Sequence, residues 1–93
     1  MEFEWDYNKD RAVLAIRGFD FDYAKRVFDD LQRFVKPDTR IDYGEDRFLA
    51  YGMIEGRVYV VVYTMRGSIY RIISARKAKP REVREYDDNQ NQG

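Results

Sequence analysis

Apolar and polar residues follow helical spacing in the first part of the chain and strand spacing in the second. The opening residues are an exception, because Phe3 and Trp5 alternate with acidic neighbours and predict a short strand with one buried face. The apolar run at residues 12–16 then predicts a helix over about residues 8–17, and Gly18 suits its end. Because this run covers most of a helix circumference, we expect the helix to be nearly surrounded, by the sheet on one side and by another chain on the other.

A second helix is predicted to begin at Asp20. Aspartate is a favoured N-cap residue, and Asp22 adds a negative charge near the positive end of the helix. The helix is expected to bury one face, which is formed by Phe21, Ala24, Val27, Phe28 and Leu31.

After Pro37 the pattern becomes typical of β-strands. Four strands are predicted, at about residues 39–43, 47–54, 57–65 and 68–75. The short links between them contain glycine and are typical of hairpin turns, so the strands are expected to form an antiparallel meander. The third of these strands is apolar on both faces, which predicts a central position in the sheet.

The last part of the chain predicts a short helix and a polar tail. Proline is common at the first position of a helix, so a helix is predicted from Pro80 to about Tyr86. Residues 87–93 are polar without periodicity and are expected to be disordered. The whole pattern predicts one α+β domain over residues 1–86, with an N-terminal strand and two helices packed on the four-stranded meander.

Composition removes several kinds of chemistry. The 93 residues include neither cysteine nor histidine, which excludes thiol nucleophiles, imidazole acid–base catalysis and metal sites built from these side chains. Any catalysis must therefore use Arg, Lys, Tyr, Asp or Glu. The apolar run 58–63 is too short to cross a bilayer, and the acidic start differs from a secretory signal, so we expect a cytoplasmic protein.

Charge is unevenly distributed along a chain whose net charge is zero. Between Arg66 and Arg84, seven basic residues accompany a single acid, Glu82. Such a cluster suits a polyanion, which it would bind through phosphates. The alternative is that these bases form ion pairs with carboxylates of the acidic first half.

No cofactor and no metal are expected. Four carboxylates lie close together in the sequence, but their spacing matches no known metal-binding loop, and aspartates that form turns explain them more simply: Asp38, Asp42, Glu45 and Asp46. The glycines form no phosphate-binding motif.

Two arginines of the last predicted strand are the best candidates for phosphate chemistry. A guanidinium on a rigid strand can bind a phosphodiester and stabilise the charge that develops when a 2′-hydroxyl attacks it. Simple alternation places Arg71 and Arg76 on opposite faces, so they serve one site only if the strand bends or ends near Ser74. A carboxylate or a tyrosine would transfer protons.

Several segments, in order along almost the whole chain, resemble the BrnT family of bacterial type II toxins: FEWD at 3–6, GF at 18–19, VFDD at 27–30, YGEDRF at 43–48, VVVYT at 60–64 and RIISARKA at 71–78. The resemblance implies a RelE-like ribonuclease fold and cleavage of RNA that arrests translation and growth. It also implies neutralisation by a BrnA-like ribbon-helix-helix antitoxin, through which the toxin reaches operator DNA. A homodimer within a heterotetramer is compatible with this interpretation.

The chain departs from the family pattern at the end of its first helix. Family members usually carry Lys-His-Gly where this chain has Ile16, Arg17 and Gly18, and Asn where it has Val13. Arginine keeps a positive charge but does not exchange protons near neutral pH. The departure leaves two interpretations open, a weakened ribonuclease that relies on arginines and a toxin-like fold that only binds protein or nucleic acid.

Resemblance and chemistry together predict two groups of site residues. The predicted catalytic residues are Arg71, Arg76, Arg47 and Glu45, and the predicted RNA-binding residues are Arg17, Arg66, Lys77, Lys79 and Lys9. Each also has a purely structural interpretation, as a turn residue, a cross-strand ion pair or a solvated side chain. A third interpretation of the chain is a general nucleic-acid-binding domain without a protein partner.

Overall fold

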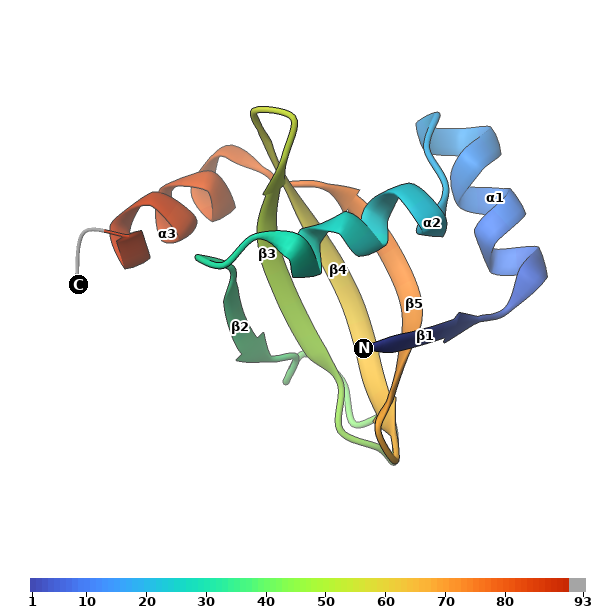
Figure 1. Cartoon of the computed structure of the whole chain (residues 1–93). Coiled ribbons are helices and arrows are strands. Elements are labelled where there is room, and N and C mark those ends of the chain that lie inside the picture. Colours follow the sequence, from blue (N-terminus) through green and yellow to red (C-terminus); the bar gives the residue numbers. More distant parts are fainter. Residues whose placement is uncertain (91–93) are drawn as a thin grey trace.

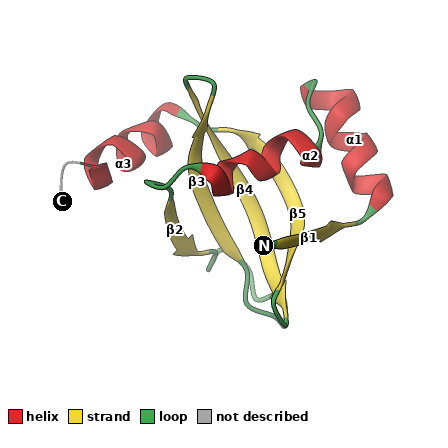
Figure 2. Ribbon diagram, viewed as in Figure 1, coloured by secondary structure: helices red, strands yellow, loops and turns green. Residues whose placement is uncertain are grey.

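A five-stranded sheet forms the centre of the fold, and helices pack against both of its faces (Figures 1 and 2). The computed structural model describes residues 1–90 of the chain. In chain order its elements are β1 (Glu2–Trp5), α1 (Tyr7–Arg17), α2 (Phe21–Ala24), the 3-10 helix η1 (Lys25–Asp29), β2 (Phe34–Pro37), β3 (Phe48–Ile54), β4 (Arg57–Arg66), β5 (Ile69–Lys77) and α3 (Pro80–Gln90).

The sheet is mixed, with the strand order β1-β5-β4-β3-β2. Each of the pairs β2/β3, β3/β4 and β4/β5 is antiparallel, whereas β1 lies parallel to β5. The α+β class is therefore confirmed. The N-terminal strand joins the sheet itself, beside the last strand. β4 is the middle strand, as its two apolar faces predicted.

The strand predicted at residues 39–43 is wrong. The strand that pairs with β3 is β2, which precedes this segment. Residues 39–43 form an irregular loop with a bend at residues 40 and 41, because aspartate side chains take up backbone N–H groups there: Asp38 accepts from Arg40 at 3.3 Å and Asp42 accepts from Gly44 at 2.9 Å.

The two faces of β4 carry two parts of the hydrophobic core. Tyr59, Val61 and Tyr63 pack with aromatic residues of β1, α2 and η1 on one face. On the other face, Val58, Val60 and Val62 pack against Leu49, Tyr51 and Tyr86, of which Tyr86 belongs to α3. A sheet covered on both sides explains why a chain this short buries so many strand residues.

α1 ends as predicted but is not surrounded. Gly18 adopts the left-handed conformation and donates to the Leu14 carbonyl, closing the helix. In α1 only Asp10 is buried, and Ile16 is 81% exposed. The helix lies at the edge of the sheet next to β5 (Figure 1), so this chain covers only one of its sides.

The second predicted helix is divided into α2 and η1. The Asp20 cap is confirmed, because its carboxylate accepts the Tyr23 N–H at 2.9 Å. The predicted inward residues are buried, namely Phe21, Ala24, Val27 and Phe28. Leu31 is 94% exposed, so its place in this face is wrong; η1 ends at Asp29, before the chain reaches it.

α3 continues four residues beyond the predicted end at Tyr86. Its later turns are held by polar contacts: Tyr86 donates to Asp30, and the Gln90 amide donates to the Gln32 carbonyl at 2.9 Å. Residues 87–90 of the predicted tail are thus helical, and residues 91–93 lie outside the described residues. Over residues 1–90, no helix is both long and apolar enough to cross a membrane.

β5 contains a bulge that changes which side chains share a face. Val62 is paired with Ser74 and Tyr63 with Ile72, which leaves Ile73 as an extra residue. Arg71 is paired with Thr64 and Arg76 with Val60, two residues on the same face of β4. The alternation predicted across β5 is therefore wrong, and both arginines lie on the α3 side of the sheet.

Candidate nucleic-acid interface

Arg76 lies near the end of β5, beside the first turn of α3. Because α3 begins at Pro80, Glu82 lies in that turn, and its carboxylate accepts from Nη1 and Nη2 of Arg76 at 2.6 and 2.8 Å. The backbone N–H of Lys79 donates to the same carboxylate at 2.8 Å. These bonds, led by those from Arg76, outweigh burial and hold the pKa of Glu82 at about 2. An ionised, buried carboxylate thus fixes the Arg76 guanidinium.

A cleft of about 370 Å³ opens beside this pair, between β2 with the loop that follows it and the start of α3. We call it the basic cleft. Five basic residues line it together with two carboxylates, which are Lys36, Arg40, Arg76, Lys79 and Arg81 with Asp38 and Glu82. The buried Tyr51 also contributes to its lining. The excess of cations makes it suitable for an anionic ligand.

Arg40 is held in the basic cleft in the same way as Arg76. The Asp38 carboxylate accepts from Nε of Arg40 at 2.8 Å and from Nη2 at 2.9 Å. The Asp38 side chain has no exposed surface, whereas the Arg40 side chain is 62% exposed. The hydrogen bonds from Arg40 keep the pKa of Asp38 below its ordinary value, so this carboxylate is also ionised at neutral pH.

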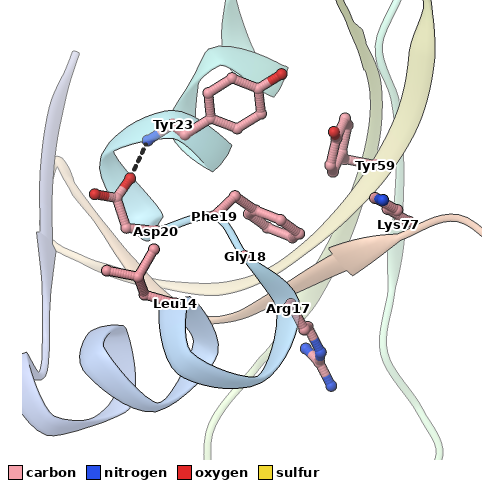
Figure 3. A pocket seen from close by; sticks show the side chains of 8 residues that line it. All are labelled: Leu14, Arg17, Gly18, Phe19, Asp20, Tyr23, Tyr59 and Lys77. Atoms are coloured by element: carbon pink, nitrogen blue, oxygen red, sulfur yellow. Dashed lines mark hydrogen bonds between the residues drawn. The ribbon is translucent and has the colours of Figure 1, made fainter.

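Arg76 also borders a smaller hollow of about 270 Å³ with Arg17, Phe19 and Lys77. These last three residues also line a hollow of about 420 Å³ between the end of α1 and the start of α2 (Figure 3). Figure 3 shows Phe19 and Tyr59 facing each other there, with Lys77 beside Tyr59. The structure therefore brings together three predicted site residues, Arg17, Arg76 and Lys77, and places Lys79 in the adjoining basic cleft.

Arg17 has a structural contact as well. Its Nη1 donates to the Ala75 carbonyl at 2.6 Å and lies 3.5 Å from the Ser74 hydroxyl. β1 pairs with β5 only as far as Ile72, so Arg17 covers a backbone group on the part of β5 that β1 leaves unpaired.

The other predicted catalytic residues lie elsewhere. Arg71 forms an ion pair with Glu4 of β1 and does not line either hollow beside Arg76. Glu45 lies in the loop before β3, where it binds Arg47 at 3.2 Å and Arg66 at 3.8 Å. The four predicted catalytic residues are therefore not gathered into one site.

Two predicted RNA-binding residues are also remote from the basic cleft. Arg66 is at the end of β4, and Lys9 is exposed in the first turns of α1. Neither lines the basic cleft or the hollow formed by Arg17 and Lys77.

Comparison with known proteins decides the family. The family model for BrnT, the ribonuclease toxin of type II toxin–antitoxin systems, matches residues 5–82. The chain belongs to the BrnT toxin family. Curated proteins gave no match. The matched range contains every residue that lines the basic cleft, from Lys36 to Glu82. Membership of a type II system implies an antitoxin partner and an RNA substrate.

In this BrnT chain, two groups near the basic cleft have pKa values that are shifted further above neutrality. The hydrogen bond from Lys36 to Glu85, at 2.9 Å, raises the pKa of the lysine, so it stays protonated. Burial raises the pKa of the Tyr51 phenol. Tyr51 lies 3.4 Å from Glu85 and beneath the Lys36 ammonium. The described residues of the cleft thus offer strong cations and hydrogen-bond donors rather than a base that titrates near pH 7.

Three basic residues of the cleft were not among the predicted site residues: Lys36, Arg40 and Arg81, although Arg81 belongs to the basic cluster seen in the sequence. Arg40 belongs to the segment 39–43, which the sequence predicts as a strand of the sheet and not as a loop beside a cleft. The signal that pointed to it is the spacing of Asp38 and Arg40, since an aspartate that caps a turn can also accept from an arginine two residues later. Lys36 was left out because β2 itself was not predicted.

Proposed function

We propose that this chain is an endoribonuclease toxin that holds an RNA phosphate in the basic cleft, with Arg76 as the central ligand. The observation that carries this proposal is the position of Arg76, which borders both hollows and is fixed by a buried carboxylate. A guanidinium has five N–H donors, and Glu82 takes two of them, so three remain for phosphate oxygens. Lys79 and Arg81 supply further positive charge at the same cleft.

The chemistry we propose is attack of a 2′-hydroxyl on the neighbouring phosphorus, without a metal ion. The 2′-oxygen forms a bond to phosphorus, the bond from phosphorus to the 5′-oxygen breaks, and the 2′-hydroxyl proton leaves to water. The 5′-oxygen gains a proton from water or from a protonated lysine. Arginines fixed in advance stabilise the extra negative charge of the transition state, which is an effect that needs no imidazole.

The proposed partner is a BrnA-like ribbon-helix-helix antitoxin that covers the basic cleft. Type II membership supports a protein partner, and the excess of cations in the cleft supports an acidic antitoxin segment. An antitoxin that covers Arg76 would keep RNA out of the cleft and so prevent its cleavage. In this proposal the toxin reaches operator DNA only through the antitoxin.

A second candidate is a binding module without significant cleavage. It is favoured by one observation, that Arg47, Arg71 and Arg76 each form an ion pair with a carboxylate of the chain. Such pairs reduce the charge that is available to a transition state, while weak binding of RNA or of an antitoxin remains.

Expression of the chain alone from a tightly controlled promoter distinguishes the two candidates. We expect growth arrest with RNA fragments for the wild type, and a loss of both for Arg76→Ala, because the central phosphate ligand is removed. Arg57→Ala, a change at an exposed arginine of β4 outside the cleft, is the matched control and should keep full toxicity. Growth and messenger integrity are followed together.

Because Arg76→Ala also leaves Glu82 without its partner, Arg81→Ala serves as a second variant at an exposed cleft residue. Circular dichroism establishes that each variant is folded. Toxicity that survives Arg76→Ala in a folded protein contradicts the proposed site. Normal growth and intact RNA with the wild type at high expression support the binding module instead.

A further inference from the structure

The basic cleft contains two arginines whose guanidinium groups are held in the same way. Each is gripped through two N–H groups by a carboxylate: Arg40 by Asp38 and Arg76 by Glu82. The carboxylates are almost completely buried, with exposed side-chain fractions of 0% for Asp38 and 3% for Glu82. The arginine is the more exposed member of each pair, with exposed side-chain fractions of 62% for Arg40 and 23% for Arg76.

This arrangement differs from an ordinary surface ion pair. An exposed pair of long side chains gains little, because both partners are solvated and mobile. Here the carboxylate is fixed in the fold, so the guanidinium that it holds loses its freedom at the edge of the cleft. The bonds to the carboxylates use two of the five N–H donors of each arginine.

The two pairs also come from different parts of the chain and meet at one cleft. Asp38 and Arg40 belong to the loop after β2, whereas Arg76 ends β5 and Glu82 opens α3. The positive charge of Arg40 lowers the pKa of Arg76, although the bonds to Glu82 raise it by more. Both arginines line the same cleft, so an anion that enters it can contact two guanidiniums at once.

We propose that Arg40 and Arg76 are the two arms of one phosphate-binding site, and that Asp38 and Glu82 are positioning residues that set the distance between the arms. The ligand is a tetrahedral phosphate group of a nucleic acid, either a backbone phosphodiester or a terminal phosphate. This inference rests on the proposed function for the identity of the substrate, and it adds Arg40 and the two carboxylates to the site.

Removing the negative charge of Asp38 distinguishes a positioning residue from a simple basic patch. Asp38→Asn removes a negative charge from the cleft, so a simple basic patch should bind an anion more tightly after the change. If Asp38 positions Arg40, the same change releases the guanidinium and binding weakens. The sign of the effect therefore separates positioning from general electrostatics.

The experiment measures binding and does not depend on cleavage. The probes are a fluorescent 2′-O-methyl RNA tetranucleotide, which has no attacking hydroxyl, with and without a 5′-phosphate, and inorganic phosphate as competitor. We expect Arg40→Ala to weaken binding of the oligonucleotide about tenfold, in the range of one good charge-assisted contact. Asp38→Asn should weaken it about threefold to tenfold, and Arg57→Ala should leave it unchanged.

Arg40→Lys is the second variant, in case Asp38→Asn fails to fold. Lysine keeps the charge but cannot take the two-point contact with Asp38, so binding should weaken as well. A gain that depends on the 5′-phosphate identifies a terminal phosphate as the ligand, and equal affinity of the two probes identifies the backbone. Unchanged or tighter binding by Asp38→Asn, or full affinity of Arg40→Lys, overturns the proposal. If oligonucleotides bind as expected while RNA is never cleaved, the proposed function fails and the two-armed site stands.

Discussion

At the scale of single residues, buried acids hold two arginines of the basic cleft in place. Asp38 and Glu82 are among the few charged side chains that are buried, and each has an arginine as its partner. Replacing Glu82 leaves the largely buried Arg76 guanidinium uncompensated, which is more costly than the loss of a surface pair, whereas the Arg40 guanidinium is mostly solvated. These acids are therefore expected to matter for folding and for binding alike.

Glu82→Gln should destabilise the protein in a pH-dependent manner. The folded pKa of Glu82, about 2, lies below the ordinary value of 4.5, so the pair stabilises the fold above pH 4.5 and ceases to do so as pH falls towards 2. This difference corresponds to about 3 kcal/mol. Urea unfolding of wild type and variant between pH 7 and pH 2 should show a gap in the free energy of unfolding that closes at low pH. Asp30 and Asp38 are present in both proteins, so their titration cancels; a gap that stays constant with pH contradicts this account.

Local signals in the sequence were reliable where one residue decides the outcome. Gly18 ends α1 and Asp20 caps α2 as predicted, because each acts through its own backbone or side chain. The site was harder to predict, since the bulge at Ile73 places Arg71 and Arg76 on the same face, where simple alternation separates them. The pairing of Arg47 with Glu45 could be foreseen because the two are neighbours in the sequence. The partners of Arg71 and Arg76 could not, because Glu4 and Glu82 are brought to them by the pairing of β1 with β5 and the docking of α3.

At the scale of elements, η1 and β3 are in unusually close contact. Gly52 of β3 is buried, and a Cβ atom at this position would lie 2.7 Å from both Cγ1 and the carbonyl oxygen of Val27 in η1. Only glycine allows the backbone of η1 to approach the sheet this closely. The short 3-10 helix is thus packed directly on β3, the strand that also pairs with β2.

Gly52→Ala should lower the free energy of unfolding by about 1–3 kcal/mol, because the new methyl group overpacks this contact. Chemical denaturation of the wild type and the variant measures the loss. Combining it with Val27→Ala should not restore stability, since the carbonyl oxygen of residue 27 still blocks the methyl group. A variant as stable as the wild type, or rescue by Val27→Ala, contradicts the backbone contact.

At the scale of the whole molecule, a chain with zero net charge separates its charges in space. The basic cleft contains five bases and two acids, whereas the hollow between η1 and the β3–β4 hairpin contains Asp29, Asp30 and Glu55 with Arg26. We therefore expect weak long-range attraction of RNA to the molecule, so that the proposed binding depends on the local field of the cleft.

RNA binding should weaken steeply with added salt. For a single strand that contacts three or four phosphates, log K should fall with log[salt] with a slope of about −2 to −3. Arg81→Ala should reduce the magnitude of the slope by about 0.7, the share of one phosphate contact. Fluorescence anisotropy with a 2′-O-methyl oligonucleotide, at salt concentrations from about 50 to about 200 mM, gives the slopes for the wild type and for Arg81→Ala. Affinity that is independent of salt excludes phosphate contacts as its source.

The bulge in β5 contains one residue, Ile73, that has no partner on β4. If one residue were deleted at Ile73, Ile72 would be joined to Ser74, and both would keep their present partners on β4. The ladder would become regular, with both arginines still on the same face. Relatives that are one residue shorter here are therefore best aligned with a gap at the bulge, because a gap elsewhere in β5 would match residues that have different partners on β4.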